Sequence, residues 1–102
     1  MLVEWSDDAR QDLDDLVHYI SRDSVFYAGT FAERIVLATR KLGDFPRIGR
    51  QIPEAEQDAF REIIVQGYRV MYHLEPDRIL ILAIMHGSRD AGEPHNQPWT
   101  DE

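Results

Sequence analysis

The sequence predicts a single α+β domain in which a helical hairpin covers one face of a small antiparallel sheet. Three segments between residues 60 and 86 are dense in β-branched and aromatic residues, which is typical of strands. Two stretches between residues 7 and 43 have apolar residues at helical spacing, and a short apolar run lies at the N-terminus. The predicted order is therefore one strand, two helices and three strands.

The sheet is expected to be a meander of residues 60–65, 68–74 and 79–86. Gln66-Gly67 offers a two-residue hairpin turn, because glycine accepts a positive φ. The stretch 75–78 offers a four-residue turn with Pro76 at its second position.

These turn lengths fix a register in which Arg69 lies opposite Ile84, and Glu62, Arg69 and His86 share one face. The other face is expected to carry Ile63, Tyr68, Val70, Tyr72, Ile81 and Ala83. A one-residue bulge would exchange the two faces beyond it.

The N-terminal half reads as residues 2–5 in a strand followed by two helices. Ser6 is a suitable N-cap for a helix from about Asp7 to Ser21. Ser24 can cap a second helix that ends near Gly43, and the short linker predicts an antiparallel hairpin.

The rest of the chain is expected to be irregular. Residues 47–58 read as a surface connection back to the sheet. Residues 91–102 lack periodicity, and Trp99 is their one large apolar residue, so we expect a tail that is flexible or ordered by a partner. Residues 1–90 then form the single domain.

Composition and charge narrow the class of protein. The 102 residues are 43% hydrophobic and 29% charged, without cysteine, as in ordinary globular domains. The net charge of −8 disfavours general nucleic-acid binding, although the basic residues are concentrated between residues 34 and 50. The chain has no visible secretory signal, and the apolar run 79–85 is far shorter than a membrane span. We therefore expect a cytoplasmic protein without membrane contact.

One group of residues has the chemistry of a metal-free ribonuclease. Arg69 beside His86, with Arg61 and Arg89 near strand ends, could bind a phosphate and transfer a proton. The alternative is structural: Glu62 and Arg69 form a cross-strand ion pair, and His86 merely ends a strand. The histidines show no metal-ligand spacing, so neither a metal nor a cofactor is expected.

The sheet face away from the helices is expected to be apolar and bare. Its predicted members are Ile64, Met71, Leu80, Leu82 and Ile84. An apolar patch of that size usually marks an interaction site, so these residues are the predicted contacts of a protein partner.

The order and spacing of several short motifs resemble the ParE/RelE toxin superfamily. In the first half these are Trp5-Ser6, Ala9, Asp12-Leu13, Tyr19-Ile20, Ala28, Phe31, Leu42, Phe45-Pro46 and Gly49-Arg50. In the second half they are Arg61-Glu62-Ile63, Tyr68-Arg69-Val70-Met71-Tyr72, Ile79-Leu80-Ile81-Leu82, His86 and Arg89.

The resemblance implies a toxin of a type II toxin-antitoxin module, bound and neutralised by a cognate antitoxin in a hetero-oligomer. ParE-like members inhibit DNA gyrase and are not enzymes, whereas RelE-like members cut messenger RNA on the ribosome. In the RelE-like case Arg61, Arg69, His86 and Arg89 would be the catalytic residues. A third alternative is a non-toxic relative that only binds its antitoxin. The Pro46, Gly49-Arg50 and His86–Arg89 elements resemble ParE-like members more closely, which favours gyrase as the target. The acidic surface predicts that the segment of the antitoxin that wraps the toxin carries basic residues.

Overall fold

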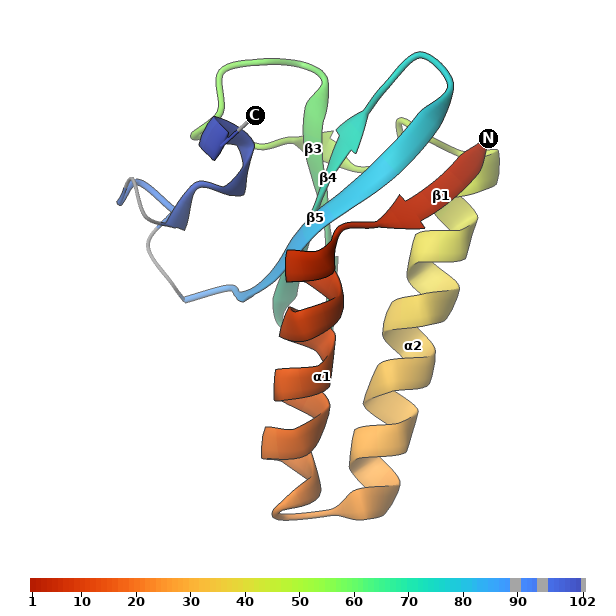
Figure 1. Ribbon diagram of the computed structural model, residues 1–102, viewed down its shortest axis with the longest axis vertical. Helices are drawn as coiled ribbons and strands as arrows, with labels where there is room; N and C mark the ends of the chain where they lie inside the picture. The colour runs from red at the N-terminus through yellow and green to blue at the C-terminus, as the bar shows by residue number, and fades with distance from the viewer. Residues whose placement is uncertain (89–90, 94–95, 102) are drawn as a thin grey trace.

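The computed structural model describes residues 1–88, 91–93 and 96–101. Its elements are β1 (Leu2–Trp5), α1 (Asp7–Ser21), α2 (Val25–Asp44), β2 (Arg50–Gln51), β3 (Phe60–Val65), β4 (Tyr68–Leu74), β5 (Arg78–His86) and the 3₁₀ helix η2 (Pro98–Asp101). The α+β class, the helical hairpin and the three-stranded meander are confirmed (Figure 1). No helix among the described residues is long and apolar enough to cross a membrane.

Both helices begin at the caps that the sequence predicts. The Ser6 hydroxyl accepts a hydrogen bond from the Ala9 amide at 3.0 Å, and the Ser24 hydroxyl accepts one from the Tyr27 amide at 3.0 Å. Each bond satisfies an amide that has no partner within its helix. The caps leave only a short connection between α1 and α2, and the two helices lie antiparallel.

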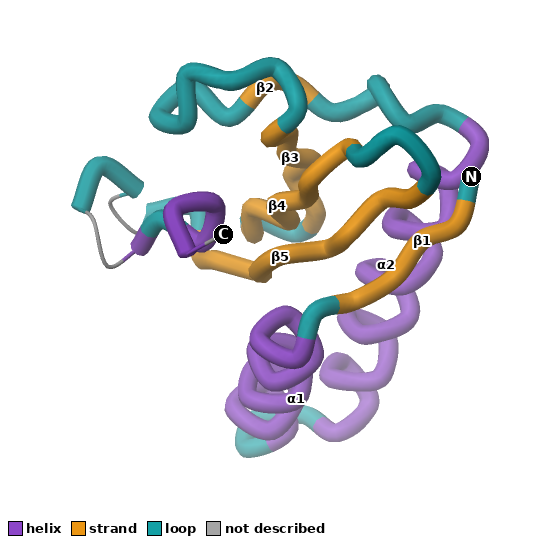
Figure 2. Tube along the Cα trace, turned by 45° about the horizontal axis from the view of Figure 1, so that its top comes forward, coloured by secondary structure: helices purple, strands orange, loops and turns teal. Residues whose placement is uncertain are grey.

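The sheet has five strands in the order β1-β5-β4-β3-β2. β1 pairs in parallel with β5 at one edge, and the other pairs are antiparallel. The two-residue strand β2 lies within the predicted surface connection and pairs with β3 at the opposite edge. Figure 2 shows both helices on one side of the sheet and the C-terminal segment on the other.

The predicted turns join the strands of the meander. Gln66 and Gly67 have φ values of 55° and 83°, the conformation of a tight hairpin turn that follows the twist of the strands. At the next turn the Glu75 amide donates to the Arg78 carbonyl at 2.9 Å. The pairings Ile64↔Arg69 and Glu62↔Met71 agree with the predicted register.

A bulge in β5 makes part of the predicted register wrong. Tyr72 pairs with Ile81 and Met71 with Ala83, so Leu82 is an extra residue. Beyond the bulge Arg69 lies opposite Met85, whereas the prediction placed it opposite Ile84. Because side chains alternate between faces, this single insertion moves every later residue of β5 to the other face.

The helix-facing core lies between the sheet and the hairpin. Its buried members are Ala9, Phe31, Ile35, Leu42, Val70, Tyr72, Ile79, Ile81 and Ile84. Ile63 and Tyr68 pack against this cluster as predicted. Ile84 takes the place that the prediction gave to Ala83, which follows from the bulge.

The second face of the sheet is covered by the chain itself, so the prediction of a bare face is wrong. A second buried cluster consists of Ile52, Ala55, Phe60, Met71, Leu82, Met85, Ala91 and Trp99. The segment between β2 and β3 supplies the first members, and the C-terminal segment supplies the last two. Trp99 is 8% exposed and lies in η2, against the sheet.

Candidate functional site

The strongest electrostatic feature is an ion-pair network on the second face of the sheet. Arg69 Nε lies 2.6 Å from Glu62 Oε1, and Arg69 Nη2 lies 2.8 Å from Glu54 Oε1. Arg50 Nη2 lies 2.6 Å from the second oxygen of Glu62. The Glu62 side chain is fully buried and that of Arg69 is 8% exposed, whereas Arg50 reaches the surface at 62% exposure, and the two arginines balance the two carboxylates in charge.

The pKa directions agree with a closed network. The hydrogen bond from Arg69 lowers the pKa of Glu54. Burial opposes the charged form of Arg69, but the hydrogen bonds to Glu54 and Glu62 outweigh burial and raise its pKa. Arg69 is therefore a permanent cation that already has its anionic partners. The structural alternative for this pair, a cross-strand ion pair, is confirmed.

Arg61 is tied into the connection that leads to β2. Its Nε donates to the Gly49 carbonyl at 2.9 Å, and Nη1 lies 2.8 Å from Oδ1 of Asp58. The side chain of Arg61 is only 12% exposed. Its hydrogen bonds hold this connection against β3, which is a structural role.

Tyr72 binds the same connection, residues 46–49, from the helix-facing side of the sheet. Its hydroxyl donates to the Pro46 carbonyl at 2.6 Å and accepts from the Gly49 amide at 3.2 Å. Burial raises the pKa of Tyr72, so the hydroxyl keeps its proton for the first bond. A Cβ atom at Gly49 would lie 2.6 Å from the Glu62 carbonyl oxygen, so the backbone approach requires glycine.

His86 does not join the arginines. It pairs with Tyr68, on the helix-facing side, and its ring lies 5.2 Å from that of Tyr68 in an edge-on arrangement. Its Nδ1 lies 2.6 Å from the Ser88 hydroxyl. The prediction that Glu62, Arg69 and His86 share a face is wrong, because of the bulge at Leu82.

The predicted ribonuclease group is thus not brought together by the described residues. Arg61 holds a loop, Arg69 is buried in its ion pairs, and His86 lies on the opposite face. Arg89 lies outside the described residues.

The predicted partner-binding residues are mostly inside the protein. Met71 is fully buried, and Leu82 and Ile84 are each 6% exposed. Leu80 packs partly buried against the second cluster, and only Ile64 is well exposed, at 58%. The prediction of an exposed side chain is wrong for Met71, Leu82 and Ile84, because the chain covers one face and the bulge turns Ile84 to the helices.

An apolar groove runs between α2 and the free part of β3. A pocket of about 300 Å³ is lined there by Arg34, Leu37, Ala38, Lys41, Ile48, Ile63, Ile64 and Val65. Leu37, Ile48 and Ile64 are 48%, 64% and 58% exposed, which leaves apolar surface available to a partner. We call this surface the α2–β3 groove.

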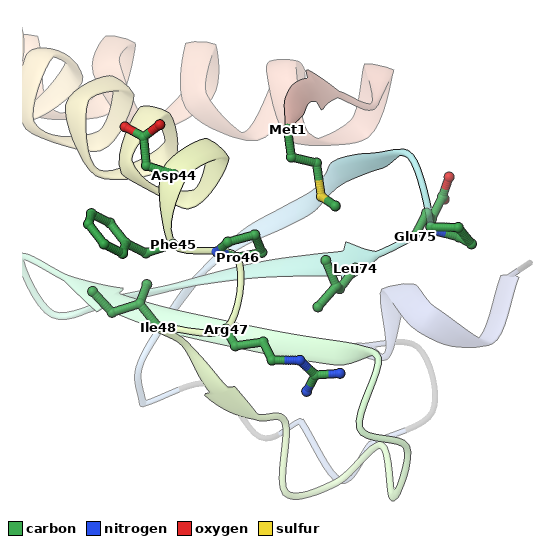
Figure 3. Close-up of a pocket in the computed structure, with 9 residues that line it drawn as sticks. Met1, Asp44, Phe45, Pro46, Arg47, Ile48, Leu74 and Glu75 are labelled. Carbon is green, nitrogen blue, oxygen red and sulfur yellow. The ribbon is translucent and has the colours of Figure 1, made fainter.

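A larger pocket extends this surface past the end of α2. It has a volume of about 830 Å³ and is lined by Met1, Asp44, Phe45, Pro46, Arg47, Ile48, Leu74, Glu75 and Pro76. Figure 3 shows Phe45 and Ile48 at one end of this pocket and Glu75 at the other. Ile48 lines both pockets, so the two pockets adjoin at this residue.

The groove includes an incomplete sheet edge. β2 pairs with β3 only as far as Glu62. If this pairing continued, Ile48 would lie opposite Ile64, but the Ile48 amide donates instead to the Phe45 carbonyl at 3.1 Å. Alternate residues of a strand direct their backbone N–H and C=O groups to the same edge. The backbone groups of Ile64 therefore point to the same edge as those of Glu62, beyond the end of β2. An added strand could pair there.

The rim of the groove is basic in an otherwise acidic protein. Arg34 and Lys41 line it, and neither forms an ion pair with any residue in the described part of the chain. The sequence shows this concentration of basic residues between 34 and 50, but it does not show that the residues face an apolar floor.

A second exposed apolar group lies at the tip of the helical hairpin. Tyr19, Val25 and Phe26 are 63%, 77% and 84% exposed, and Tyr27 is 47% exposed. Sequence reasoning missed this group, although Val25-Phe26-Tyr27 directly after the cap Ser24 was a visible signal.

The comparisons with known proteins agree with the fold. A family model described as the ParE toxin of the type II toxin-antitoxin system, parDE, matches residues 3–91. A solved structure entitled "Chromosomal ParDE TA system from P. aeruginosa" superposes with a TM-score of 0.70 at 22% identity, covering 84% of this chain and 95% of that chain. A search of curated proteins found no match. The family match extends over most of the sequence, and the chain therefore belongs to the ParE toxin family of type II toxin-antitoxin systems.

Proposed function

We propose that this toxin inhibits DNA gyrase as a binding protein and that an antitoxin neutralises it by occupying the α2–β3 groove. Membership of the ParE family gives the toxin role. The resemblance of the Gly49-Arg50 and His86–Arg89 segments to ParE-like members supports gyrase as the target.

The closed ion-pair network of Arg69 is the main observation in favour of an inhibitor that is not an enzyme. Cleavage of RNA without a metal needs a cation that faces the reacting phosphate and a nearby proton donor. Arg69 is 6% exposed and already bonded to Glu62 and Glu54, and His86 lies on the other face. Freeing Arg69 would leave Glu54 without its arginine and the buried Glu62 with Arg50 alone, which is costly.

The groove offers an antitoxin both backbone and side-chain contacts. An extended segment can add a strand beside Ile64, and apolar side chains on the same segment can pack on Leu37 and Ile48. Because the rim carries Arg34 and Lys41, the segment should bring acidic residues to this place. Basic residues in the antitoxin, predicted from the overall charge, would lie outside the groove.

The target is tested with purified toxin in two assays. In a gyrase supercoiling assay we expect inhibition, and on ribosomes programmed with messenger RNA we expect no cleavage. Cleavage that is lost in His86→Ala and Arg69→Ala would overturn the proposal and favour the RelE-like mechanism. Inactivity in both assays would leave a protein that only binds its antitoxin.

The groove is tested with the protein encoded beside the toxin gene as the antitoxin probe. Ile64→Asp places a charge in the apolar floor and should weaken binding by about a hundredfold. Tyr19→Asp is the matched control, since Tyr19 is 63% exposed on α1 and lines neither pocket of this surface. Equal affinity for both variants would exclude the groove as the antitoxin site.

A further inference from the structure

The tip of the helical hairpin carries apolar side chains that the fold does not use. Val25 and Phe26 lie in the first turn of α2 and are 77% and 84% exposed, and Phe26 is the most exposed large apolar residue of the described chain. In Figure 1 the connection between the two helices is the part of the hairpin farthest from the sheet. The tip therefore projects away from both cores.

Helix formation does not explain these residues. The first turn of a helix favours acidic residues because of the helix dipole, yet α2 has none there and has Val25-Phe26-Tyr27 instead. Ser24 already supplies the cap, and polar residues at positions 25 and 26 would be equally compatible with the helix. Because these side chains do not stabilise the fold while they are exposed to water, their presence indicates contact with another molecule.

The charges around the tip identify the kind of partner. Asp23, in the connection between the helices, and Asp14 and Asp15, about two turns before the end of α1, are exposed, against Arg22 in the connection. An anionic lipid surface would be repelled by this excess of negative charge. A protein pocket with apolar walls and a rim of lysine or arginine is complementary to it, and aromatic side chains entering such a pocket dominate binding energy.

The tip is separate from the α2–β3 groove. Phe26 and Leu37 are on the same helix, and the rise per residue of an α-helix places them about 16 Å apart along its axis. Substitutions at the tip can therefore leave the groove intact, and the reverse also holds.

We propose that the hairpin tip is the surface by which this toxin contacts its cellular target, through insertion of Phe26 and Val25 into an apolar pocket with a basic rim. The inference rests on the proposed function, because it assigns a surface to the target that the toxin inhibits. The two surfaces then have different partners: the tip has the target, and the groove has the antitoxin.

The test compares three proteins in the gyrase supercoiling assay and in cells. The tip variant is Val25→Ser with Phe26→Ser, and the matched control is Leu37→Ser with Ile64→Ser in the groove. We expect the tip variant to need at least about tenfold more protein for half-inhibition, while it binds the protein encoded beside the toxin gene like wild type. The groove control should show the reverse pattern.

Each other outcome is decisive. Inhibition by the tip variant at the wild-type concentration would overturn the inference. If wild type arrests growth without inhibiting gyrase, only the gyrase proposal fails. In that case, a tip variant that no longer arrests growth but still binds the antitoxin supports the tip as the target-binding surface, and a tip variant that still arrests growth overturns the inference. A wild-type dimer in light scattering that the tip variant abolishes would also overturn the inference. If wild type causes no arrest, the toxin proposal and the inference fail together.

Discussion

Arg69 and Glu62 lie diagonally across β4 and β3, with Nε of the arginine 2.6 Å from a carboxylate oxygen of a fully buried glutamate. Glu54, in the segment that covers this face, and Arg50, in β2, complete the network. The ion pair between Arg69 and Glu54 joins the sheet to its covering segment, so Arg69, one of the residues that suggested catalysis, has a structural role.

Removing Glu62 should destabilise the fold strongly. Glu62→Ala leaves Arg69 buried with one carboxylate fewer, and breaking a buried pair in this way costs about 3 kcal/mol in the free energy of unfolding. Urea denaturation measures this loss. Glu62→Leu combined with Arg69→Met should recover most of it, because both charges are then removed. If Glu62→Ala alone is as stable as wild type, the ion-pair network does not contribute to the free energy of unfolding.

The stability contributed by Glu54 should disappear in acid. Its pKa is lowered in the folded protein by the hydrogen bond from Arg69, so the carboxylate stabilises the fold above the ordinary glutamate pKa of about 4.3. That contribution is lost as the pH falls through the lowered pKa. Thermal unfolding of wild type and Glu54→Gln should differ at pH 7 and converge as the pH falls from the ordinary glutamate pKa through the lowered pKa of Glu54. Glu56→Gln, on the same segment, is the control and should follow wild type throughout.

The sequence predicts the elements of this fold because their signals are local. Ser6 and Ser24 mark the helix starts, and Gln66-Gly67 fixes the hairpin between β3 and β4. The bulge at Leu82 has no local signal, since every residue from Ile79 to Met85 is apolar and alternation cannot be read there. The faces of β5 were therefore predictable only before the bulge.

The segments that cover the second face could not be predicted from the sequence for a different reason. Ile52, Ala55 and Trp99 lie in segments without periodicity, and what such residues contact depends on the folded chain. The length of apolar sequence in β5 correctly indicated that this face needs a cover. It did not indicate that the cover comes from the same chain.

Trp99 should be the main anchor of that cover. It is 8% exposed within the second cluster, and Trp99→Ala should cost about 3 kcal/mol in the free energy of unfolding by leaving a cavity over the sheet. Denaturation with urea measures this change. Phe45→Ala is the control, because Phe45 is 61% exposed and its loss should leave the midpoint unchanged. Equal midpoints for both variants would mean that Trp99 does not hold the face closed.

The basic rim of the groove should make antitoxin binding depend on salt. Charge reversal in Arg34→Glu with Lys41→Glu should weaken binding of the protein encoded beside the toxin gene and reduce its dependence on ionic strength. Calorimetry at low and high salt measures both quantities. Arg10→Glu with Arg22→Glu changes the net charge equally on the hairpin and is the control. The same loss in both variants would indicate a general effect of charge rather than contacts in the groove.

Tyr72 should control how firmly the connection after α2 is held at the end of the groove. Its hydroxyl bridges the Pro46 carbonyl at 2.6 Å and the Gly49 amide at 3.2 Å, and Tyr72→Phe leaves both without this partner. We expect a loss of about 2 kcal/mol in the free energy of unfolding, with faster hydrogen exchange at residues 47–50. The matched control is Tyr27→Phe, since the Tyr27 hydroxyl makes only an exposed contact of 3.5 Å to Gln66. Unchanged exchange in Tyr72→Phe would mean that Arg61 alone, through its bond to the Gly49 carbonyl, holds this connection.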